Sequence, residues 1–331
     1  MKRIEERLQG ALIPAVPVPL REGRELDLQG AERLAAYIAR ADVAGVAVWA
    51  HTGRGLLLEE AIAVETLRGW RAALPGRIVI AGAGCRESST LPQGPRGDAA
   101  LAAGARRMAS LAARNGADAV LAHPPSRFRD LDPGRRLEAI LEYHREIAAE
   151  GLPTLAFHLF ESAGGVRYTV EELRGILGIP GVVGVKVATL DSVMTYQDIS
   201  DFLAHELPEK ALLTGEDRFL GYSLLRGACG ALIGMGGVCP SFQKELVEAA
   251  IGARTGCETS AARWVALSAR ADRLAECLFI HPMDGYIGRV LHGLAALGVI
   301  APESARDPWG PALTGRELER VEVVVRELEE F

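Results

Sequence analysis

The sequence predicts a (β/α)8 TIM barrel, a fold of the α/β class, followed by a C-terminal helical extension. Short apolar segments rich in Val and Ile, bounded by Gly or Pro, recur along residues 1–240. Longer amphipathic segments lie between them, a pattern typical of parallel strands whose two faces are both covered. Because most steps are close to one strand–helix unit and there are eight, a closed barrel is favoured over an open sheet.

The individual elements follow from length, composition and flanking residues. The predicted strands, which are too short for helices, are Leu12–Pro19, Gly45–Ala50, Ile78–Gly82, Ala119–Ala122, Thr154–His158, Val182–Val187, Ala211–Thr214 and Ala231–Ile233. The predicted helices between them include Leu28–Asp42, Glu59–Leu74, Asp98–Asn115, Arg135–Glu150 and Val170–Leu177. Several of these helices end at Gly or Asn, which readily adopt the left-handed conformation of a helix terminus.

The remainder of the chain is predicted to be helical. We divide the chain into a barrel, residues 1–240, and an extension, residues 241–331, that packs on the barrel. No linker-like composition separates the two parts. The extension is expected to hold the helices Phe242–Ala253, Glu258–Phe279, Gly285–Leu297 and Thr314–Glu330, the last of which begins with a capping signature at Thr314.

Composition excludes several classes of protein. The chain has 331 residues, of which 49% are hydrophobic, and a formal net charge of −6. A mildly acidic chain without a basic run is not expected to bind nucleic acid or a membrane. Five cysteines without metal-ligand spacing are typical of reduced thiols, and no signal-peptide or membrane-spanning pattern is present. We therefore expect a soluble, cytoplasmic protein without a cofactor.

Lys186 is the leading candidate for chemistry. It lies near the end of the sixth predicted strand, in the run Val182-Val-Gly-Val-Lys186-Val, and active sites of TIM barrels lie at the C-terminal ends of the strands. An ammonium group among valines is desolvated, which lowers its pKa, and a neutral amine can attack a ketone to form a Schiff base. From the residues alone, a lysine that reaches solvent or a carboxylate is an equal alternative.

The loop after the second predicted strand is the second candidate. It reads His51-Thr52-Gly53-Arg54. Small residues at a strand-to-helix turn expose backbone N–H groups that suit a substrate carboxylate, and Thr52 adds a hydroxyl group. Arg54 is a candidate for contacting an anionic substrate. Taken alone, the signal is weak, because many such loops contain Gly and Thr.

Four segments in this order resemble one known family. They are Ile13-Pro-Ala-Val-Pro-Val-Pro19, His51-Thr-Gly53, Gly184-Val-Lys186 and Thr214-Gly-Glu-Asp217. Together they are similar to the motifs of the dihydrodipicolinate synthase / N-acetylneuraminate lyase family, and the resemblance covers nearly the whole chain. It implies a lyase, either an aldolase or a dehydratase, that acts on a 2-oxo acid such as pyruvate or a 2-keto-3-deoxy sugar acid.

The resemblance also implies roles for individual residues. Lys186 would carry the imine, and Thr52 and Gly53 would hold the carboxylate of the 2-oxo acid. Members of the family are usually homotetramers. A homo-oligomer is also suggested by the apolar positions Val290, Leu291, Leu294 and Leu297 in the extension.

Several positions depart from the family pattern. Phe157 stands where the fifth strand normally ends in a proton-carrying Tyr, and His51 replaces a Thr or Ser that works with it. Arg54 replaces an acidic residue, and Ser162 replaces a substrate-binding Arg. Because phenylalanine has no exchangeable proton, the usual relay is absent, and synthesis of dihydrodipicolinate itself is not expected.

Three histidines follow predicted strands: His51, His123 and His158. Imidazole titrates near neutral pH, so His51 or His158 can replace the missing phenol; the alternative for each is a local hydrogen bond. No carboxylate or HxxxH spacing accompanies them, so no metal site is predicted.

Two functions of different classes remain open at this stage. The first is a Schiff-base lyase with an altered proton relay. The second is a catalytically impaired family member that binds a small acid in a regulatory role. A phosphate-binding barrel isomerase is disfavoured, because the seventh strand is followed by Thr-Gly-Glu-Asp rather than a glycine-rich phosphate loop.

Overall fold

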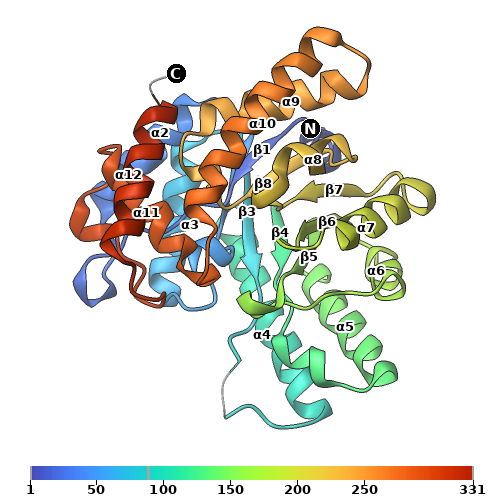
Figure 1. Ribbon diagram of the computed structural model, residues 1–331. Helices are drawn as coiled ribbons and strands as arrows, with labels where there is room; N and C mark the ends of the chain where they lie inside the picture. Colours follow the sequence, from blue (N-terminus) through green and yellow to red (C-terminus); the bar gives the residue numbers. More distant parts are fainter. Residues whose placement is uncertain (1, 88–89, 330–331) are drawn as a thin grey trace.

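The computed structural model of this chain, which describes residues 2–87 and 90–329, contains one parallel eight-stranded barrel (Figure 1). Its hydrogen-bonded strand order is β1-β8-β7-β6-β5-β4-β3-β2. The strands are β1 (Leu12–Pro14), β2 (Gly45–Val48), β3 (Ile78–Ala83), β4 (Ala119–Ala122), β5 (Thr154–Leu159), β6 (Val182–Ala188), β7 (Ala211–Thr214) and β8 (Gly230–Ile233). A parallel bridge between Ala15 and Ala47 joins β1 to β2 and closes the barrel. The predicted TIM-barrel fold is thereby confirmed.

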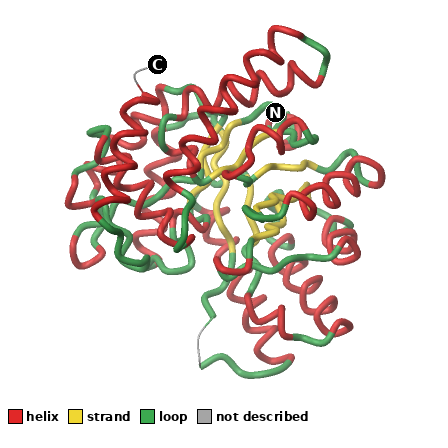
Figure 2. Tube along the Cα trace, in the orientation of Figure 1, coloured by secondary structure: helices red, strands yellow, loops and turns green. Residues whose placement is uncertain are grey.

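Helices surround the strands, as Figure 2 shows. Those between the strands are α2 (Leu28–Arg40), α3 (Glu60–Ala73), α4 (Pro95–Arg114), α5 (Pro133–Ala148), α6 (Val170–Leu177), α7 (Val193–Glu206) and α8 (Leu220–Leu225). A short α1 (Ile4–Arg7) precedes β1, and α9 (Pro240–Arg254) follows β8. Helices α7 and α8 supply the two crossovers for which the sequence pattern gave no range. The division at residue 240 stays a prediction, since the chain runs from β8 through a short turn into α9.

The first strand is shorter than predicted. Strand β1 ends at Pro14, whereas the sequence pattern extends to Pro19. Two further prolines, Pro17 and Pro19, interrupt this segment. Because proline has no N–H to donate, it cannot continue a strand ladder. The segment after Ala15 nevertheless stays buried up to Leu20.

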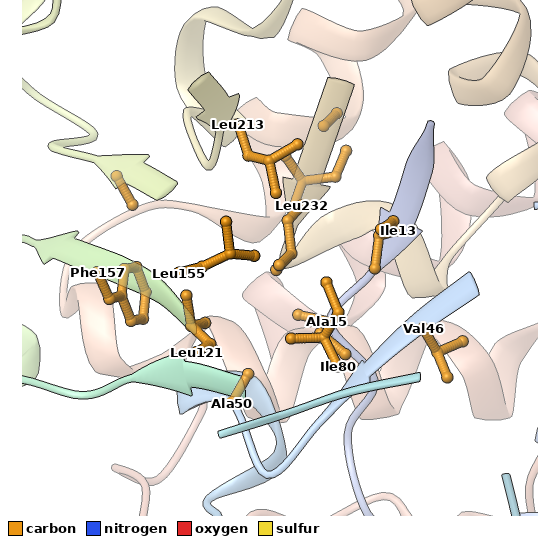
Figure 3. Packing of buried hydrophobic residues seen from close by; sticks show 14 of the residues in the cluster. Ile13, Ala15, Val46, Ala50, Ile80, Leu121, Leu155, Phe157, Leu213 and Leu232 are labelled. Atoms are coloured by element: carbon orange, nitrogen blue, oxygen red, sulfur yellow. The ribbon is translucent and has the colours of Figure 1, made fainter. Parts of the chain in front are cut away.

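The barrel interior is filled by side chains of alternate strand residues (Figure 3). Leu155 of β5, Leu213 of β7 and Leu232 of β8 are fully buried there. Alternation along each strand directs neighbouring residues to opposite faces, so the residues between them pack against the helices. Any polar side chain that faces inward near the ends of the strands therefore stands out against an apolar core.

The extension consists of α10 (Glu258–Leu278), α11 (Tyr286–Ala296) and α12 (Gly315–Glu329). Helices α11 and α12 lie beside α2 in Figure 1, and the Tyr37 hydroxyl group contacts Glu329 at 3.0 Å. The predicted cap of the last helix is formed, because the Thr314 N–H donates to Glu317 at 2.8 Å and the Glu317 N–H donates back to the Thr314 hydroxyl group.

The apolar positions of α11 have a different role from the one expected. Val290, Leu291 and Leu294 are buried within the chain, and the half-buried Leu297 packs against the same core. They form part of the core between α11 and its neighbours, so they do not offer an exposed surface for a second copy. Among the described residues, no helix is long and apolar enough to cross a membrane.

Candidate active site

Lys186 lies in the barrel interior near the end of β6. Its neighbours across the sheet are Phe157 of β5 and Leu213 of β7. The side chain is buried, with 6% of the residue exposed. Space for it depends on Gly215, because a Cβ atom there would lie only 2.5 Å from Lys186 Cε. The glycine of the Thr-Gly-Glu-Asp motif thus makes room for the lysine.

The surroundings of the amine favour its neutral form. Burial lowers the pKa of Lys186 from 10.5 to about 8, against the opposing negative charges of Asp217 and Glu216. The amine also lies 4.3 Å from the centre of the Phe157 ring. At neutral pH a substantial fraction of Lys186 is therefore unprotonated, as a nucleophilic amine requires.

Two carboxylates on the loop after β7 lie near the amine. Burial raises the pKa of both Asp217 and Glu216. The carboxylate of Asp217 accepts the N–H of Met235 at 2.7 Å and that of Gly234 at 3.2 Å. Glu216 accepts the N–H groups of the turn after β6. The two N–H groups bound to Asp217 and the positive charge of Lys186 oppose the effect of burial and favour the charged form of this carboxylate. The sequence did not assign this role to Asp217.

The predicted carboxylate-binding loop is a short 3-10 turn, His51–Gly53. Thr52 is buried and lines the same cavity as Lys186, and its hydroxyl group lies 2.9 Å from the Tyr286 hydroxyl group. The Gly53 N–H donates to the Ala50 carbonyl at 3.0 Å, so it is already engaged. The Thr52 N–H has no hydrogen-bond acceptor among the described residues and remains available to a ligand.

His51 lines the same cavity as Lys186, but its pKa differs from the expected one. Its Nδ1 lies 3.0 Å from the Tyr286 hydroxyl group, and its Nε2 lies 3.8 Å from the Asp284 carboxylate. Burial, together with the positive charges of Arg54 and Lys186, lowers the pKa of His51 to about 3. The imidazole is therefore neutral at neutral pH, and the expectation that it titrates there is wrong.

Arg54 is paired with two carboxylates of the extension. Its guanidinium group contacts Asp307 at 2.6 Å and Asp284 at 3.0 Å. These carboxylates raise the pKa of Arg54, and the Asp307 side chain is only 3% exposed. These contacts tie the loop after β2 to the extension, and because Arg54 also lines a cavity with His51 and His123, its contact with a substrate stays a prediction.

His158 lies on the opposite side of β5 from Lys186. Its neighbour Phe157 faces the amine, and consecutive strand residues point to opposite faces. The Nδ1 atom of His158 accepts the Tyr168 N–H at 3.3 Å, and the two rings meet edge to face. The structure therefore places His158 outside the cluster around Lys186, and we no longer propose it as a proton carrier.

His123 lines a second, outer cavity of about 270 Å³ beside the amine site. His51 and Leu159 belong to the walls of both cavities, so the outer one continues from the inner. Burial lowers the pKa of His123 to about 3, so it too is neutral at neutral pH. Arg86, Glu87 and Ser126 add polar groups to this wall. The arrangement offers room for the part of a substrate that extends beyond its reacting end.

Tyr286 and Asp284 are the residues of this site that the sequence did not indicate. Both come from the extension: Asp284 lies in the turn before α11, and Tyr286 is the first residue of that helix. A tyrosine at the start of an amphipathic helix carries no signal in a single sequence. Among the described residues, no group of three or more His, Cys, Asp or Glu side chains is arranged to hold a metal ion.

Comparison with known proteins places the chain in a family. The model of the family described as "Dihydrodipicolinate synthetase family" matches residues 8–327. The chain belongs to this family. Its members include Schiff-base-forming aldolases and synthases that act on pyruvate-derived substrates. The resemblance inferred from the motifs around Lys186 is thus confirmed.

The following relatives are distant. The chain is 26% identical to a probable mitochondrial 4-hydroxy-2-oxoglutarate aldolase of Emericella nidulans, over 80% of this chain and 81% of that protein. It is also 26% identical to a 4-hydroxy-tetrahydrodipicolinate synthase of Xanthomonas axonopodis, over 76% of each chain. The solved sialic acid aldolase of Ruminococcus gnavus superposes with a TM-score of 0.79 at 20% identity, over 98% of each chain. This last likeness shows the fold.

Proposed function

We propose that this protein is a class I lyase, an aldolase or a dehydratase, that forms a Schiff base between Lys186 and a 2-oxo acid. The observation that carries the proposal is the buried amine of Lys186, whose pKa burial lowers to about 8. A lysine with a reduced pKa, fixed beside a carboxylate in a barrel mouth, is the arrangement that imine formation needs. Pyruvate and 2-keto-3-deoxy sugar acids are the substrate classes that we favour.

The loop after β2 supports the recognition of a 2-oxo acid. Thr52 shares the inner cavity with Lys186, and its N–H is available to a carboxylate. We propose that this N–H and the hydroxyl group of Thr52 hold the substrate carboxylate while the ketone carbon meets the amine. Gly53 contributes by its shape, because a Cβ atom there would lie 2.9 Å from the Val16 carbonyl oxygen.

We also propose that His51 takes part in proton transfer, in place of the family residue that it substitutes. Because its pKa is low, it does so as a neutral imidazole, accepting a proton at one ring nitrogen as it releases one from the other. Phe157 instead packs against the amine, where the centre of its ring lies 4.3 Å from Lys186 Nζ.

The proposal is tested by reductive trapping. The chain has only four lysines, Lys2, Lys186, Lys210 and Lys244, so peptide mass spectrometry assigns an adduct without ambiguity. We expect borohydride in the presence of pyruvate to add the mass of a reduced adduct to Lys186. Lys186→Ala should abolish both the adduct and any lyase activity, while Lys244→Ala, on the outer surface of α9, should change neither.

The same experiment separates the two functional classes. If pyruvate binds, as measured by calorimetry, but borohydride leaves Lys186 unmodified, the protein is a non-catalytic family member that binds a small acid. A folded Lys186→Ala variant with near wild-type turnover would contradict the Schiff-base mechanism. A subsequent screen of 2-oxo acids and sugar acids, read by trapping, identifies the substrate.

Assembly and location remain proposals as well. We propose a homo-oligomer, as in tetrameric family members, although the buried apolar positions of α11 no longer supply a reason for it. A solved relative at 20% identity is described as a monomeric dihydrodipicolinate synthase variant. We propose a cytoplasmic location, whereas the Emericella nidulans relative is named as mitochondrial.

A further inference from the structure

The phenol of Tyr286 occupies a central place in the candidate site. Its hydroxyl group lies 2.9 Å from the Thr52 hydroxyl group and 3.0 Å from His51 Nδ1. Its ring stacks on Phe279, at 4.6 Å between centroids, and on His51, at 5.8 Å. The side chain is buried and lines the inner cavity together with Lys186. A tyrosine held by two stacked rings and at its hydroxyl group has little freedom to move.

The contacts of Tyr286 form part of a hydrogen-bonded line of proton-exchanging groups. We name this line, His51–Tyr286–Thr52, the relay chain. At its outer end, His51 Nε2 lies 3.8 Å from the Asp284 carboxylate, and the Asp284 side chain is 38% exposed. At its inner end, Thr52 shares the cavity with Lys186. The relay chain therefore connects the protein surface with the reacting amine.

We propose that Tyr286, a residue of the C-terminal extension, supplies the phenolic proton transfer that Phe157 cannot provide from strand β5. The inference rests on the proposed Schiff-base function and names a further residue for it. In effect, the hydroxyl group reaches the site from helix α11 instead of from the barrel wall, and it meets the substrate through Thr52.

The step assigned to the relay chain balances in atoms and charge. The neutral Lys186 amine adds to the 2-oxo carbon, and its proton passes to the oxygen to give a carbinolamine. Loss of that hydroxyl group as water then requires one more proton. The Thr52 hydroxyl group gives this proton and receives one from the Tyr286 hydroxyl group. Tyr286 in turn receives the proton of His51 Nδ1, while His51 Nε2 takes a proton from solvent. The carbon–oxygen bond breaks and the iminium ion forms.

Every group of the relay chain ends this step neutral, which suits its surroundings. Burial raises the pKa of Tyr286, so a free phenolate is disfavoured and the proton leaves only as another arrives. The charged groups that face this region are Lys186, Asp217, Arg54 and Asp284. Arg54 is paired with carboxylates, and Asp217 accepts two backbone N–H groups. The step therefore requires no change in the protonation state of Asp217 or Arg54.

The test compares two Tyr→Phe variants in timed imine formation. Each protein is mixed with pyruvate, quenched with borohydride at intervals, and analysed for adduct at Lys186. We expect Tyr286→Phe to slow the formation of the adduct by roughly 10²–10⁴-fold, the usual contribution of general acid–base groups, while the adduct still accumulates. Tyr168→Phe is the matched control: this buried phenol packs against His158, its hydroxyl group has no partner among the described residues, and its loss should leave the rate unchanged.

Two further measurements distinguish proton transfer from a merely structural role. A solvent deuterium isotope effect on imine formation is expected in the wild type and should change in Tyr286→Phe but not in Tyr168→Phe. Thr52→Val breaks the relay chain at the next position, so its loss of rate and that of Tyr286→Phe should not add in the double variant. If Tyr286→Phe does not fold, Thr52→Val by itself still tests whether the relay chain is needed for imine formation.

The outcomes separate this inference from the function on which it rests. If the wild type gives no adduct, both proposals fall. If the wild type gives an adduct and Tyr286→Phe forms it at a rate within twofold of wild type, only the role of Tyr286 falls. Fully additive losses in the Thr52→Val double variant would likewise overturn the relay chain.

Discussion

The lowered pKa of Lys186 leads to a quantitative prediction about pH. The amine attacks only when it is neutral, so the initial rate of imine formation should follow the neutral fraction of Lys186. Raising the pH removes the proton, and the rate should rise about tenfold per pH unit below the pKa and level off above it. With a pKa of about 8, the midpoint is expected near pH 8.

The size of the effect follows from the two pKa values. At pH 7 a lysine with a pKa of about 8 is neutral in about a tenth of the molecules. A lysine at the ordinary value of 10.5 would be neutral in about three molecules in ten thousand. Desolvation of this amine therefore increases the nucleophilic form roughly 300-fold at pH 7.

The charge of Asp217 predicts the direction in which the midpoint moves in a variant. Its carboxylate stabilises the ammonium form, so Asp217→Asn should lower the pKa of Lys186 further, by about 1 to 3 units for a charge within about 4–6 Å. The midpoint should then move to lower pH, and imine formation at pH 7 should become faster. Asp201→Asn, which removes an exposed carboxylate paired with Arg226, is the matched control and should leave the midpoint in place.

The assay is timed incubation with pyruvate from pH 6 to pH 10, with a borohydride quench and quantification of the Lys186 peptide. A rate that continues to rise through pH 10 without a plateau would show that the amine is not desolvated. A midpoint that moves to higher pH in Asp217→Asn would refute the assigned electrostatics.

Three further predictions address the relay, the fold and the assembly. His51→Ala should reduce turnover by roughly 10²–10⁴-fold without removing a limb of the pH profile near 6.5, because its pKa of about 3 lies outside the assay range; unchanged turnover would exclude it from the relay. Asp307→Asn removes one charged partner of the buried Arg54 and should lower the free energy of unfolding, measured in urea, by about 3 kcal/mol. The control Arg174→Met removes an exposed ion pair and should lower it by less than about 1 kcal/mol. Equal losses of stability in the two variants would contradict this prediction. Sedimentation at micromolar concentration should show a homo-oligomer, and a monomer would contradict that proposal.

Local sequence patterns determined the framework of the protein. Strand length, Val and Ile content and the regular step between segments predicted all eight strands of the barrel, because these features depend on neighbouring residues and on burial of both sheet faces. The end of β1 was missed, since Pro17 interrupts an otherwise apolar run. Lys186 and Thr52 were placed near the mouth because both follow from their positions at strand ends.

The tertiary structure decided which side chains meet there, because those contacts join segments far apart in the chain. Tyr286 lies 234 residues from Thr52, and no local pattern records that their hydroxyl groups meet at 2.9 Å. The same holds for Arg54, whose ion-pair partner Asp307 lies 253 residues away. The pKa of His51 also depends on folding, since burial and the positive charge of Lys186, 135 residues away, join the neighbouring Arg54 in lowering it. Sequence supplies the reactive groups, and packing of the extension against the barrel decides which of them can exchange a proton.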